Sequence, residues 1–574
     1  MNGRRWVPVT GIILLFFLAG ASLHAQEEQD WRFGVIEAYT ARNAARELDI
    51  GWTRLRFQWA DVQAAGPDTW APDVSDEQID EQLAEGRELV GLLIGIPDWA
   101  RDEAGLPSGL WLAHDDPANT WGTFVRDIVG RYDGRIDHWI IWNEPDIAAT
   151  EVAHSWDGSV DDFYQLQRVA YLAAKEANPD AVIHLAAFTY WADYDAGREQ
   201  YMARLLDRIL ADPEAARHNY YFDIATAHLY FQPDQVYDLL GVFQEMMAGR
   251  GLPRPIWLVE TNAPPYDDPD WPVAEPALAV SSTEQAAYIP QAVAAALAGG
   301  ADRIAVYKLR DTEGDRAANP EPFGLLRLDG SRRVAYTTYR EAIRFMRGTT
   351  SAARERWDEV GQFRLEQDDR ITTVLFSRLP QPQQVEVEAI AGSARLVDMW
   401  GQEEVVEAQN GRYTIDLQQA LCTQTIGDYC MIGGTVMYLI EARDGGPPPL
   451  DPPPLAPLPT IIPTPLPTAT ETPFPTASPT PPSTAAPAPS ATSTAGSSPA
   501  AATKTATASA ASIAAAQEPD SQPDPATLAT AVPAQNAAAE TQPSVPPSFL
   551  LLTLAAVLGA ALLLYLAIRA RRRP

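Results

Sequence analysis

Cysteine is nearly absent from this chain of 574 residues. The two that occur, Cys422 and Cys430, lie close together in LCTQTIGDYC. In an oxidising compartment such a pair forms a short-loop disulfide more often than a metal site. The pair therefore predicts a disulfide, with a metal site as the weaker alternative.

Positive charge is also scarce. The chain has 43 Lys and Arg against 76 Asp and Glu, a formal charge of −33. Binding to phosphates requires clustered cations, so this balance argues against nucleic acid as a partner, and the solubility of a secreted acidic protein is enough to explain it. The seven histidines are scattered and form no His-Glu-x-x-His pattern. We expect neither a metal nor another cofactor.

The two ends of the chain carry targeting signals. Residues 1–25 have a basic start, an apolar centre and small residues before Gln26, which predicts a secretory signal peptide; an uncleaved signal anchor is the alternative. The uncharged run Phe549–Ile568 is long enough to span a bilayer, and an arginine-rich tail follows it. No Leu-Pro-x-Thr-Gly sorting motif precedes this run. We therefore expect a single-pass protein at the cell surface, with its N-terminal domains outside.

The middle of the chain alternates short apolar runs with amphipathic ones. Eight strands alternating with helices favour a (β/α)8 barrel, and the missing Gly-rich phosphate loop lowers the rival doubly wound sheet. Helical patterns cover 121–132, 162–177 and 284–300. The predicted strands are 32–38, 52–59, 89–97, 137–144, 181–187, 222–230, 255–261 and 303–309.

A second pattern begins at about residue 350, where alternating polar and apolar residues predict a small β-sandwich packed on the barrel. A Pro, Thr, Ser and Ala stretch follows, which cannot bury enough surface to fold and is predicted to be a disordered stalk. The expected organisation is a signal peptide (1–25), a barrel (26–349), a β-sandwich (350–445), a linker (446–547), a transmembrane helix (548–568) and a cytoplasmic tail (569–574).

Two glutamates end strands on opposite sides of the predicted barrel. Glu144 ends the fourth strand, in HWIIWNEPD, and Glu260 ends the seventh, in PIWLVETN. Active-site residues of such barrels lie at the C-terminal ends of the strands. Two facing carboxylates suit glycoside hydrolysis, in which one protonates the leaving oxygen and the other attacks the anomeric carbon. Dry surroundings and a nearby negative charge would keep Glu144 protonated, whereas Glu260 needs hydrogen-bond donors to stay ionised.

The chain from about 31 to 349 resembles clan A of the glycoside hydrolases, which are retaining (β/α)8 enzymes. WNEPD carries this resemblance, supported by RYDGRIDHWIIWNEPD, GIPDWA and FGLLRLDGSRRVAYTTYR, which are similar to family 39 and family 5 relatives. The resemblance implies that Glu144 is the general acid/base and Glu260 the nucleophile. It also implies that Asn143 hydrogen-bonds the sugar 2-hydroxyl.

Supporting residues follow from the same resemblance. Arg54 matches the arginine that keeps the nucleophile ionised, although Arg56 has the same strand parity and could take that role. His228 and Tyr230 match the pair that positions the nucleophile and contacts the sugar. Trp59, Trp99 and Trp142 either offer stacking faces to a sugar or fill the barrel. Of the three, Trp99 is the candidate for substrate binding.

The eighth strand departs from the clan. Many clan A enzymes have a tryptophan there, whereas this chain has RIAVYKLRD, with Tyr307, Lys308 and Arg310 in that region. Lys308 suggests a cationic subsite for an acidic sugar, although a solvated lysine at a strand end is the plainer interpretation. The loops 261–283 and 310–322 are predicted to wall the cleft.

Three functions are consistent with these features. The leading one is a secreted, membrane-tethered retaining glycosidase, monomeric in its barrel, that acts on extracellular oligo- or polysaccharide. The second is a non-catalytic barrel that binds glycans, although binding does not require the carboxylate pair. The third is a surface protein whose stalk displays the barrel to a partner, which predicts a large apolar surface patch.

Overall fold

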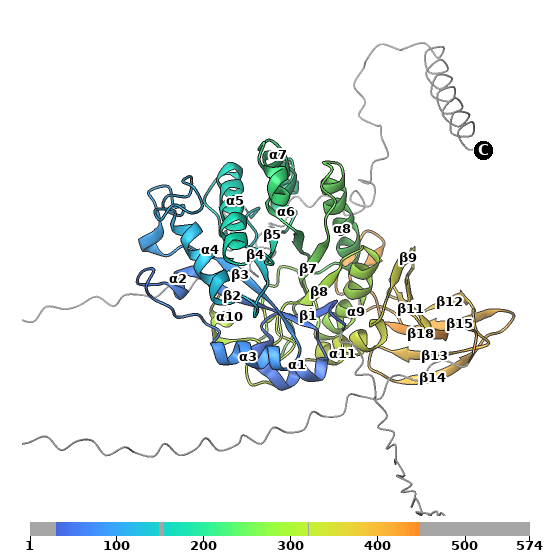
Figure 1. Cartoon of the computed structure of the whole chain (residues 1–574). Coiled ribbons are helices and arrows are strands. Elements are labelled where there is room, and N and C mark those ends of the chain that lie inside the picture. Colours follow the sequence, from blue (N-terminus) through green and yellow to red (C-terminus); the bar gives the residue numbers. More distant parts are fainter. Residues whose placement is uncertain (1–29, 148–153, 319–320, 447–574) are drawn as a thin grey trace, which may run out of the picture. The chain divides into compact units, whose positions relative to one another are not determined.

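The computed structural model describes residues 30–147, 154–318 and 321–446 (Figure 1). The predicted signal peptide, linker, transmembrane helix and cytoplasmic tail lie outside these residues. Within the described part of the chain, no helix is both long and apolar enough to cross a membrane.

Eight parallel strands form a closed barrel in the order β1 to β8, and β1 closes it by pairing Phe33 with Ile304 of β8. All eight predicted strands are confirmed, because each run buries apolar residues on both faces of a parallel sheet. The strands are β1 (Phe33–Val35), β2 (Trp52–Gln58), β3 (Glu88–Ile94), β4 (His138–Ile141), β5 (Val182–Phe188), β6 (Ile224–His228), β7 (Ile256–Thr261) and β8 (Arg303–Val306).

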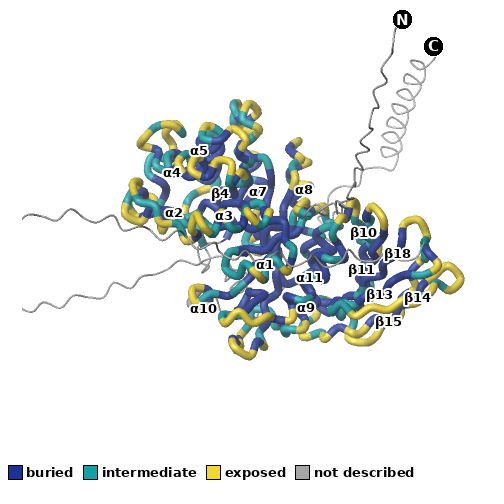
Figure 2. The backbone as a smooth tube through the Cα atoms, turned by 60° about the horizontal axis from the view of Figure 1, so that its bottom comes forward, coloured by how far each residue is buried: buried dark blue, intermediate teal, exposed yellow. Residues whose placement is uncertain are grey.

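Helices surround the barrel, and the chain is most deeply buried along the strands they cover (Figures 1 and 2). The α-helices are α1 (Arg42–Leu48), α2 (Trp59–Val62), α3 (Asp76–Ala84), α4 (Thr120–Arg131), α5 (Val160–Ala177), α6 (Trp191–Asp195), α7 (Tyr201–Leu210), α8 (Pro233–Ala248), α9 (Ser282–Ala298), α10 (Glu313–Ala318) and α11 (Val334–Met346). Short 3-10 turns are η1 (Ala38–Ala41), η2 (Asp98–Ala100) and η3 (Ala215–Tyr221).

The three predicted helices are present, but α5 and α9 begin two residues earlier than expected. Ser159 caps α5 by accepting a hydrogen bond from the backbone N–H of Asp162, whose side chain accepts one in return. Ser281 and Glu284 form the same capping box at the start of α9. Each box satisfies two backbone donors and therefore fixes the first turn ahead of the amphipathic pattern.

The C-terminal domain is built from antiparallel strands. A six-stranded sheet has the order β14-β13-β18-β11-β10-β9, and β12 pairs with β15. Val385 of β12 and Ile415 of β15 share a hydrophobic core with Leu375 and Leu439 of the larger sheet, so the predicted β-sandwich is confirmed. The strands are β9 (Ser351–Trp357), β10 (Val360–Glu366), β11 (Arg370–Ser377), β12 (Gln383–Glu388), β13 (Ser393–Asp398), β14 (Glu403–Glu407), β15 (Arg412–Leu417), β16 (Thr425–Ile426), β17 (Tyr429–Cys430) and β18 (Met437–Ala442).

The β-sandwich packs on the barrel through α9. The buried Gln291 side chain accepts from the backbone N–H of Gly433 at 3.0 Å and donates to the carbonyl of Gly434 at 3.1 Å. Nearby, the structure links Cys422 and Cys430 by a disulfide, with their Cα atoms 4.7 Å apart. The predicted disulfide therefore braces the β16–β17 hairpin rather than the barrel.

Candidate active site

Glu144 lies three residues beyond the end of β4, in a strained turn. Trp142 and Glu144 both have positive φ, 72° and 45°, which costs a non-glycine residue about 1–3 kcal/mol and is concentrated at functional sites. Two backbone hydrogen bonds hold the turn, from the Trp142 N–H to the carbonyl of Leu93 and from the Glu144 N–H to that of Ala187. The neighbouring strands thus fix the acid at the C-terminal end of the barrel.

Glu260 lies inside β7, and two groups hold its carboxylate. Arg54 Nη2 is 2.5 Å from Oε1, and the Tyr230 hydroxyl donates a short hydrogen bond to Oε2. Arg56 instead pairs with Asp73 at 3.5 Å. The arginine that contacts Glu260 is therefore Arg54, which settles the choice that strand parity left open.

His228, at the end of β6, bridges the two carboxyl groups. Its Nδ1 lies 2.5 Å from Glu144 Oε1, and its Nε2 lies 3.5 Å from Glu260 Oε1. Arg54 Nη1 is also 3.5 Å from Nε2 and can donate to it, which assigns the ring proton to Nδ1 as the donor to Glu144. One ligand atom from each of Glu144, His228 and Glu260 lies within 4.8 Å of the others.

The surroundings give the two carboxyl groups different affinities for a proton. Both are fully buried, and burial raises both pKa values. The negative charges of Glu260 and Asp146 raise the pKa of Glu144 further, to well above its usual range. The Arg54 cation and the Tyr230 hydroxyl counteract the rise at Glu260. A proton shared by the pair therefore resides on Glu144, while Glu260 stays ionised.

Asn143 and Asp146 support the turn that carries Glu144. Asn143 is buried beside Ala187 of β5, and a hydrogen bond from its side chain limits the rise in the pKa of Glu144. Asp146 is buried too and accepts hydrogen bonds from the Thr189 N–H at 2.7 Å and the Tyr190 N–H at 3.0 Å. Burial raises the pKa of Asp146 to about 6. WNEPD contains this residue, but no pattern in the sequence singles it out.

The aromatic candidates divide into two groups. Tyr307 is buried just after β8, with its ring edge-on to Phe323. Trp99 donates its indole N–H to the carbonyl of Gln63 and packs edge-on against Trp59. No contact between Trp99 and either carboxyl group occurs among the described residues. Tyr307 is thus buried just beyond β8, whereas Trp99 is partly exposed in η2, after β3, and its stacking role stays a prediction.

Two other tryptophans belong to the core. Trp59 is fully buried and stacks on Phe124 with ring centroids 4.9 Å apart. Trp142 is 2% exposed and lies edge-on to Trp156. Both rings fill space, so the plainer of the two predicted roles holds for them.

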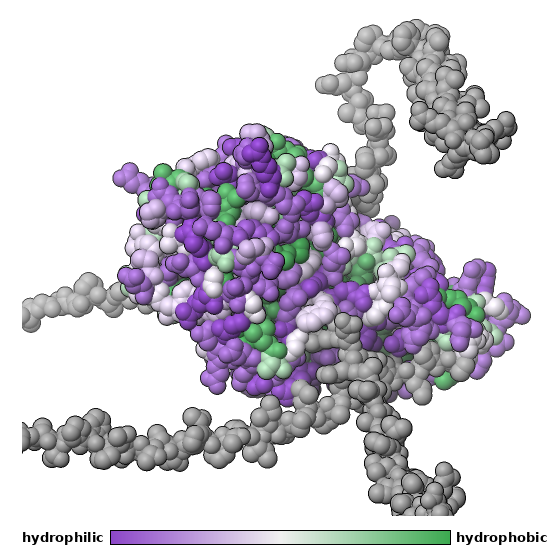
Figure 3. Space-filling model, viewed as in Figure 1, coloured by the Kyte–Doolittle hydropathy of each residue, from purple (hydrophilic) through white to green (hydrophobic). Residues whose placement is uncertain are grey.

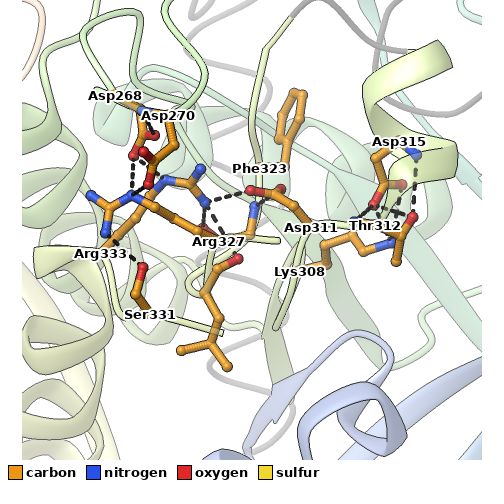
Figure 4. Close-up of polar contacts among 12 residues, drawn as sticks. Asp268, Asp270, Lys308, Asp311, Thr312, Asp315, Phe323, Arg327, Ser331 and Arg333 are labelled. Atoms are coloured by element: carbon orange, nitrogen blue, oxygen red, sulfur yellow. Dashed lines mark hydrogen bonds and ion pairs between the residues drawn. The ribbon is translucent and has the colours of Figure 1, made fainter. Parts of the chain in front are cut away.

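Both sequence-based interpretations of Lys308 are wrong. Its side chain is 4% exposed, and Nζ lies 2.5 Å from Glu37 and 3.0 Å from Asp315. Figure 4 shows the contact with Asp315, which also accepts a hydrogen bond from the Thr312 hydroxyl. A lysine buried between two carboxylates is neither solvated nor free to bind an acidic sugar. Glu37, at the end of β1, was not predicted as a site residue, because a glutamate in a loop carries no distinctive motif.

A buried arginine ties together the two loops predicted to wall the cleft. Arg333 donates to Asp268 Oδ2 at 2.8 Å and to Asp311 Oδ2 at 2.6 Å (Figure 4). Asp268 belongs to the loop after β7, and Asp311 to the loop after β8. Because all three side chains are buried, this cluster holds both loops against the segment that leads into α11.

Glu144, His228 and Glu260 together offer ligand atoms for a cation. Two carboxylates and an imidazole are ordinary ligands for a divalent metal. The Arg54 guanidinium, however, already places a positive charge 2.5 Å from Glu260. That charge opposes a second cation and matches an acid–nucleophile pair better than a metal centre.

Two surface crevices lie away from these residues. One of about 250 Å³ lies between α9 and the β-sandwich, lined by residues such as Glu284 and Met399. The other, of about 410 Å³, lies beside α1. Neither contains Glu144 or Glu260, so the chemistry of the site, rather than the size of a hollow, identifies it.

Comparisons with known proteins agree on the fold. No protein-family profile matches the chain, and no curated protein matches it in sequence. Among solved structures, it is similar to a family 39 glycoside hydrolase from Bacteroides cellulosilyticus WH2, with a TM-score of 0.53 and 16% identity over 72% of this chain and 81% of that one. A glucosidase from Croceicoccus marinus has a TM-score of 0.49 and 13% identity, over 72% and 96% of the two chains. The chain thus resembles the clan A glycoside hydrolases in fold, as the WNEPD region implied.

Proposed function

We propose that the protein is a secreted, membrane-tethered retaining glycoside hydrolase that cleaves extracellular carbohydrate by double displacement. The observation that carries this proposal is the approach of Glu144 and Glu260 to within 4.8 Å, with an arginine on only one of them. A gap of about 5 Å leaves no room for a water molecule between a base and the sugar, and is typical of retaining enzymes. The fold of the family 39 relative agrees with this assignment.

In the first step, Glu260 attacks the anomeric carbon while Glu144 gives its proton to the departing glycosidic oxygen. Glu144 Oε2 is suited to this transfer, because it is buried and His228 holds the other oxygen, Oε1. In the second step, Glu144, now ionised, takes a proton from water, and the resulting hydroxide displaces Glu260. His228 holds Glu144 Oε1 throughout, so the acid keeps its orientation.

The alternative is a barrel that binds glycans without cleaving them. The complete burial of both carboxyl groups favours it, because a sugar can reach them only if part of the surrounding wall moves. Against it, binding alone requires no raised pKa on one carboxyl group and no arginine on the other. We therefore prefer the enzyme.

A protein that only displays its barrel to a partner has less support. The large apolar side chains that are exposed number eight in the described residues, on several different elements, and the face in Figure 3 is mostly hydrophilic. Partner-binding surfaces usually gather such side chains into one patch. The proposed location at the cell surface rests on the sequences of the two terminal segments. Protease treatment of intact cells should release the barrel and leave the predicted transmembrane segment in the membrane.

The test of the enzymatic proposal uses the full-length protein and a panel of 4-nitrophenyl glycosides. We expect hydrolysis by the wild type, with the first sugar product in the same anomeric configuration as the substrate by NMR. Glu144→Gln and Glu260→Gln should both be impaired, whereas Glu88→Gln, at the opposite end of the barrel, should not be. Binding of glycans without turnover, equal in all four proteins, would favour the alternative.

A further inference from the structure

Three cations at the C-terminal end of the barrel are paired with carboxylates. Arg54 faces Glu260, and Arg56 faces Asp73. Lys308 lies between Glu37 and Asp315, the latter at 3.0 Å. These pairs engage three cations, while Arg310, beyond β8, donates to the carbonyl of Leu328. These three cations face four carboxylates, because Lys308 has two partners.

Glu37 differs from the other carboxylates of this cluster. Its backbone N–H donates to the carbonyl of Arg54 at 3.3 Å, so it lies next to the strand position that holds Glu260. Its Oε2 is fixed by Lys308 at 2.5 Å, while its side chain remains 13% exposed. Within the described residues, Lys308 is the one side chain that pairs with Glu37. One carboxylate oxygen is therefore held in place, and part of the side chain is open to solvent.

Sugars present hydroxyl groups, which a fixed carboxylate accepts as hydrogen-bond donors. A hydrogen bond to a charged acceptor is stronger than one between neutral groups. A sugar carboxylate offered to the same oxygen would instead be repelled, since like charges a few ångströms apart interact unfavourably. The same residue would thus attract one class of sugar and reject the other.

Resting on the proposed function, we propose that Glu37 is a substrate-binding residue that accepts a hydrogen bond from a hydroxyl of a neutral sugar and excludes sugars that carry a carboxylate. Lys308 serves as its positioning residue, because it fixes one oxygen and is itself held by Asp315. Oε2 of Glu144, the oxygen that His228 does not hold, marks where the same sugar would meet the acid.

The experiment compares matched pairs of ligands that differ only at C6: 4-nitrophenyl β-D-glucoside with the β-D-glucuronide, and β-D-galactoside with the β-D-galacturonide. Binding is measured by calorimetry and turnover by release of 4-nitrophenol, on the full-length wild type, Glu37→Gln and Glu88→Gln. Glu37→Gln keeps the shape of the side chain and leaves Lys308 paired with Asp315. Glu88→Gln is the matched control, because it removes a carboxylate from the start of β3, far along the strand from the site.

We expect the wild type to bind the neutral member of at least one pair about tenfold or more tightly than the acidic member. Glu37→Gln should weaken the neutral ligand on the order of tenfold and narrow the ratio within the pair, with Glu88→Gln unchanged. Tighter binding of the uronides by the wild type, unchanged affinities in Glu37→Gln, or no binding of any pair would overturn the inference.

Binding and turnover separate this inference from the proposed function. Glu37-dependent binding of a neutral sugar without release of 4-nitrophenol would support the role of Glu37 and remove the hydrolase. Turnover of a uronide as fast as its neutral partner would support the hydrolase and overturn the role of Glu37.

Discussion

The two ends of the barrel carry similar residues in different arrangements. At the N-terminal ends of the strands, His138 Nδ1 lies 2.9 Å from His184 Nε2. The ring of His184 lies edge-on to Trp257 with centroids 4.6 Å apart. Glu88 closes this cluster by pairing with Arg303 and, at 3.4 Å, with His138. One carboxylate, partly exposed, serves the whole group.

The C-terminal end also combines histidine, arginine and glutamate, but it has two carboxyl groups instead of one, and both are fully buried. Glu144 and Glu260 share His228, and only Glu260 has an arginine. The first arrangement satisfies its charges and stabilises the barrel. The second leaves one carboxyl group protonated beside an ionised one, which is a state prepared for proton transfer. The two clusters contain the same residue types. They differ in the number of buried carboxyl groups per cation, which is higher in the cluster that we propose to be catalytic.

Among substitutions that test this difference between the two ends, Glu260→Gln should have the largest effect on activity. Removal of the nucleophile should lower kcat/KM by at least about 10⁴-fold, because no other group can form the covalent intermediate. Steady-state hydrolysis of the best aryl glycoside measures it. Glu88→Gln should stay within a few-fold of wild type, and a comparable loss there would mean that both ends of the barrel serve one structural role.

Glu144→Gln should have the next largest effect, which should depend on the leaving group. With poor leaving groups the loss of acid catalysis should be about 10²–10⁴-fold. With 2,4-dinitrophenolate, which needs no proton to depart, the first step should recover. The alkaline limb of the pH–rate profile, which reports the raised pKa of Glu144, should vanish in the variant. A loss that is uniform across leaving groups would contradict the assignment.

The two buried histidines offer a matched pair for a smaller effect. His228→Asn should lower kcat about 10- to 100-fold and shift the pH profile, since Glu144 loses the donor that orients it. His184→Asn should lower Tm by a few degrees and leave kcat unchanged, because His184 contacts His138 and Trp257 at the other end of the barrel. Kinetics and thermal melting on the same preparations measure both, and equal kinetic losses would remove the distinction between the two ends.

Much of this arrangement is predictable from the sequence, and the reason is local. A parallel barrel strand is a continuous buried run, so HWIIW and PIWLV locate β4 and β7, and the glutamates that follow are placed by the strand ends. The choice between Arg54 and Arg56 is not local. Both have the same parity, but Arg54 pairs with Val90 and Arg56 with Leu92, so they differ in height within the barrel, and only the closed structure shows which height matches Glu260.

The ion pair of Glu37 and Lys308 could not be predicted for a similar reason. β1 pairs with β8 when the barrel closes, and this brings together residues near the two ends of the domain. A lysine that ends a strand is usually solvated, and nothing near Lys308 in sequence announces its two carboxylate partners. Long-range closure of the barrel, rather than any local motif, converts it into a buried positioning residue.

The smallest predicted effect concerns stability, and its sign differs between the two ends. Burial raises the pKa of Glu144, so the stability linked to its proton is present below the unfolded pKa of about 4.3 and is lost as pH rises toward the folded value. Burial lowers the pKa of His184, so stability linked to its neutral form is present above about pH 6.5 and is lost as pH falls.

Thermal melting from pH 4 to pH 8 separates these contributions. Glu144→Gln should melt a few degrees above wild type at pH 8, because the amide removes a carboxyl group that the fold prevents from ionising, and the two should converge near pH 4. His184→Asn should instead flatten the acid side of the curve. A Glu144→Gln variant that is less stable than wild type at pH 8 would show that the carboxyl group stabilises the barrel, and the two ends would then not differ in kind.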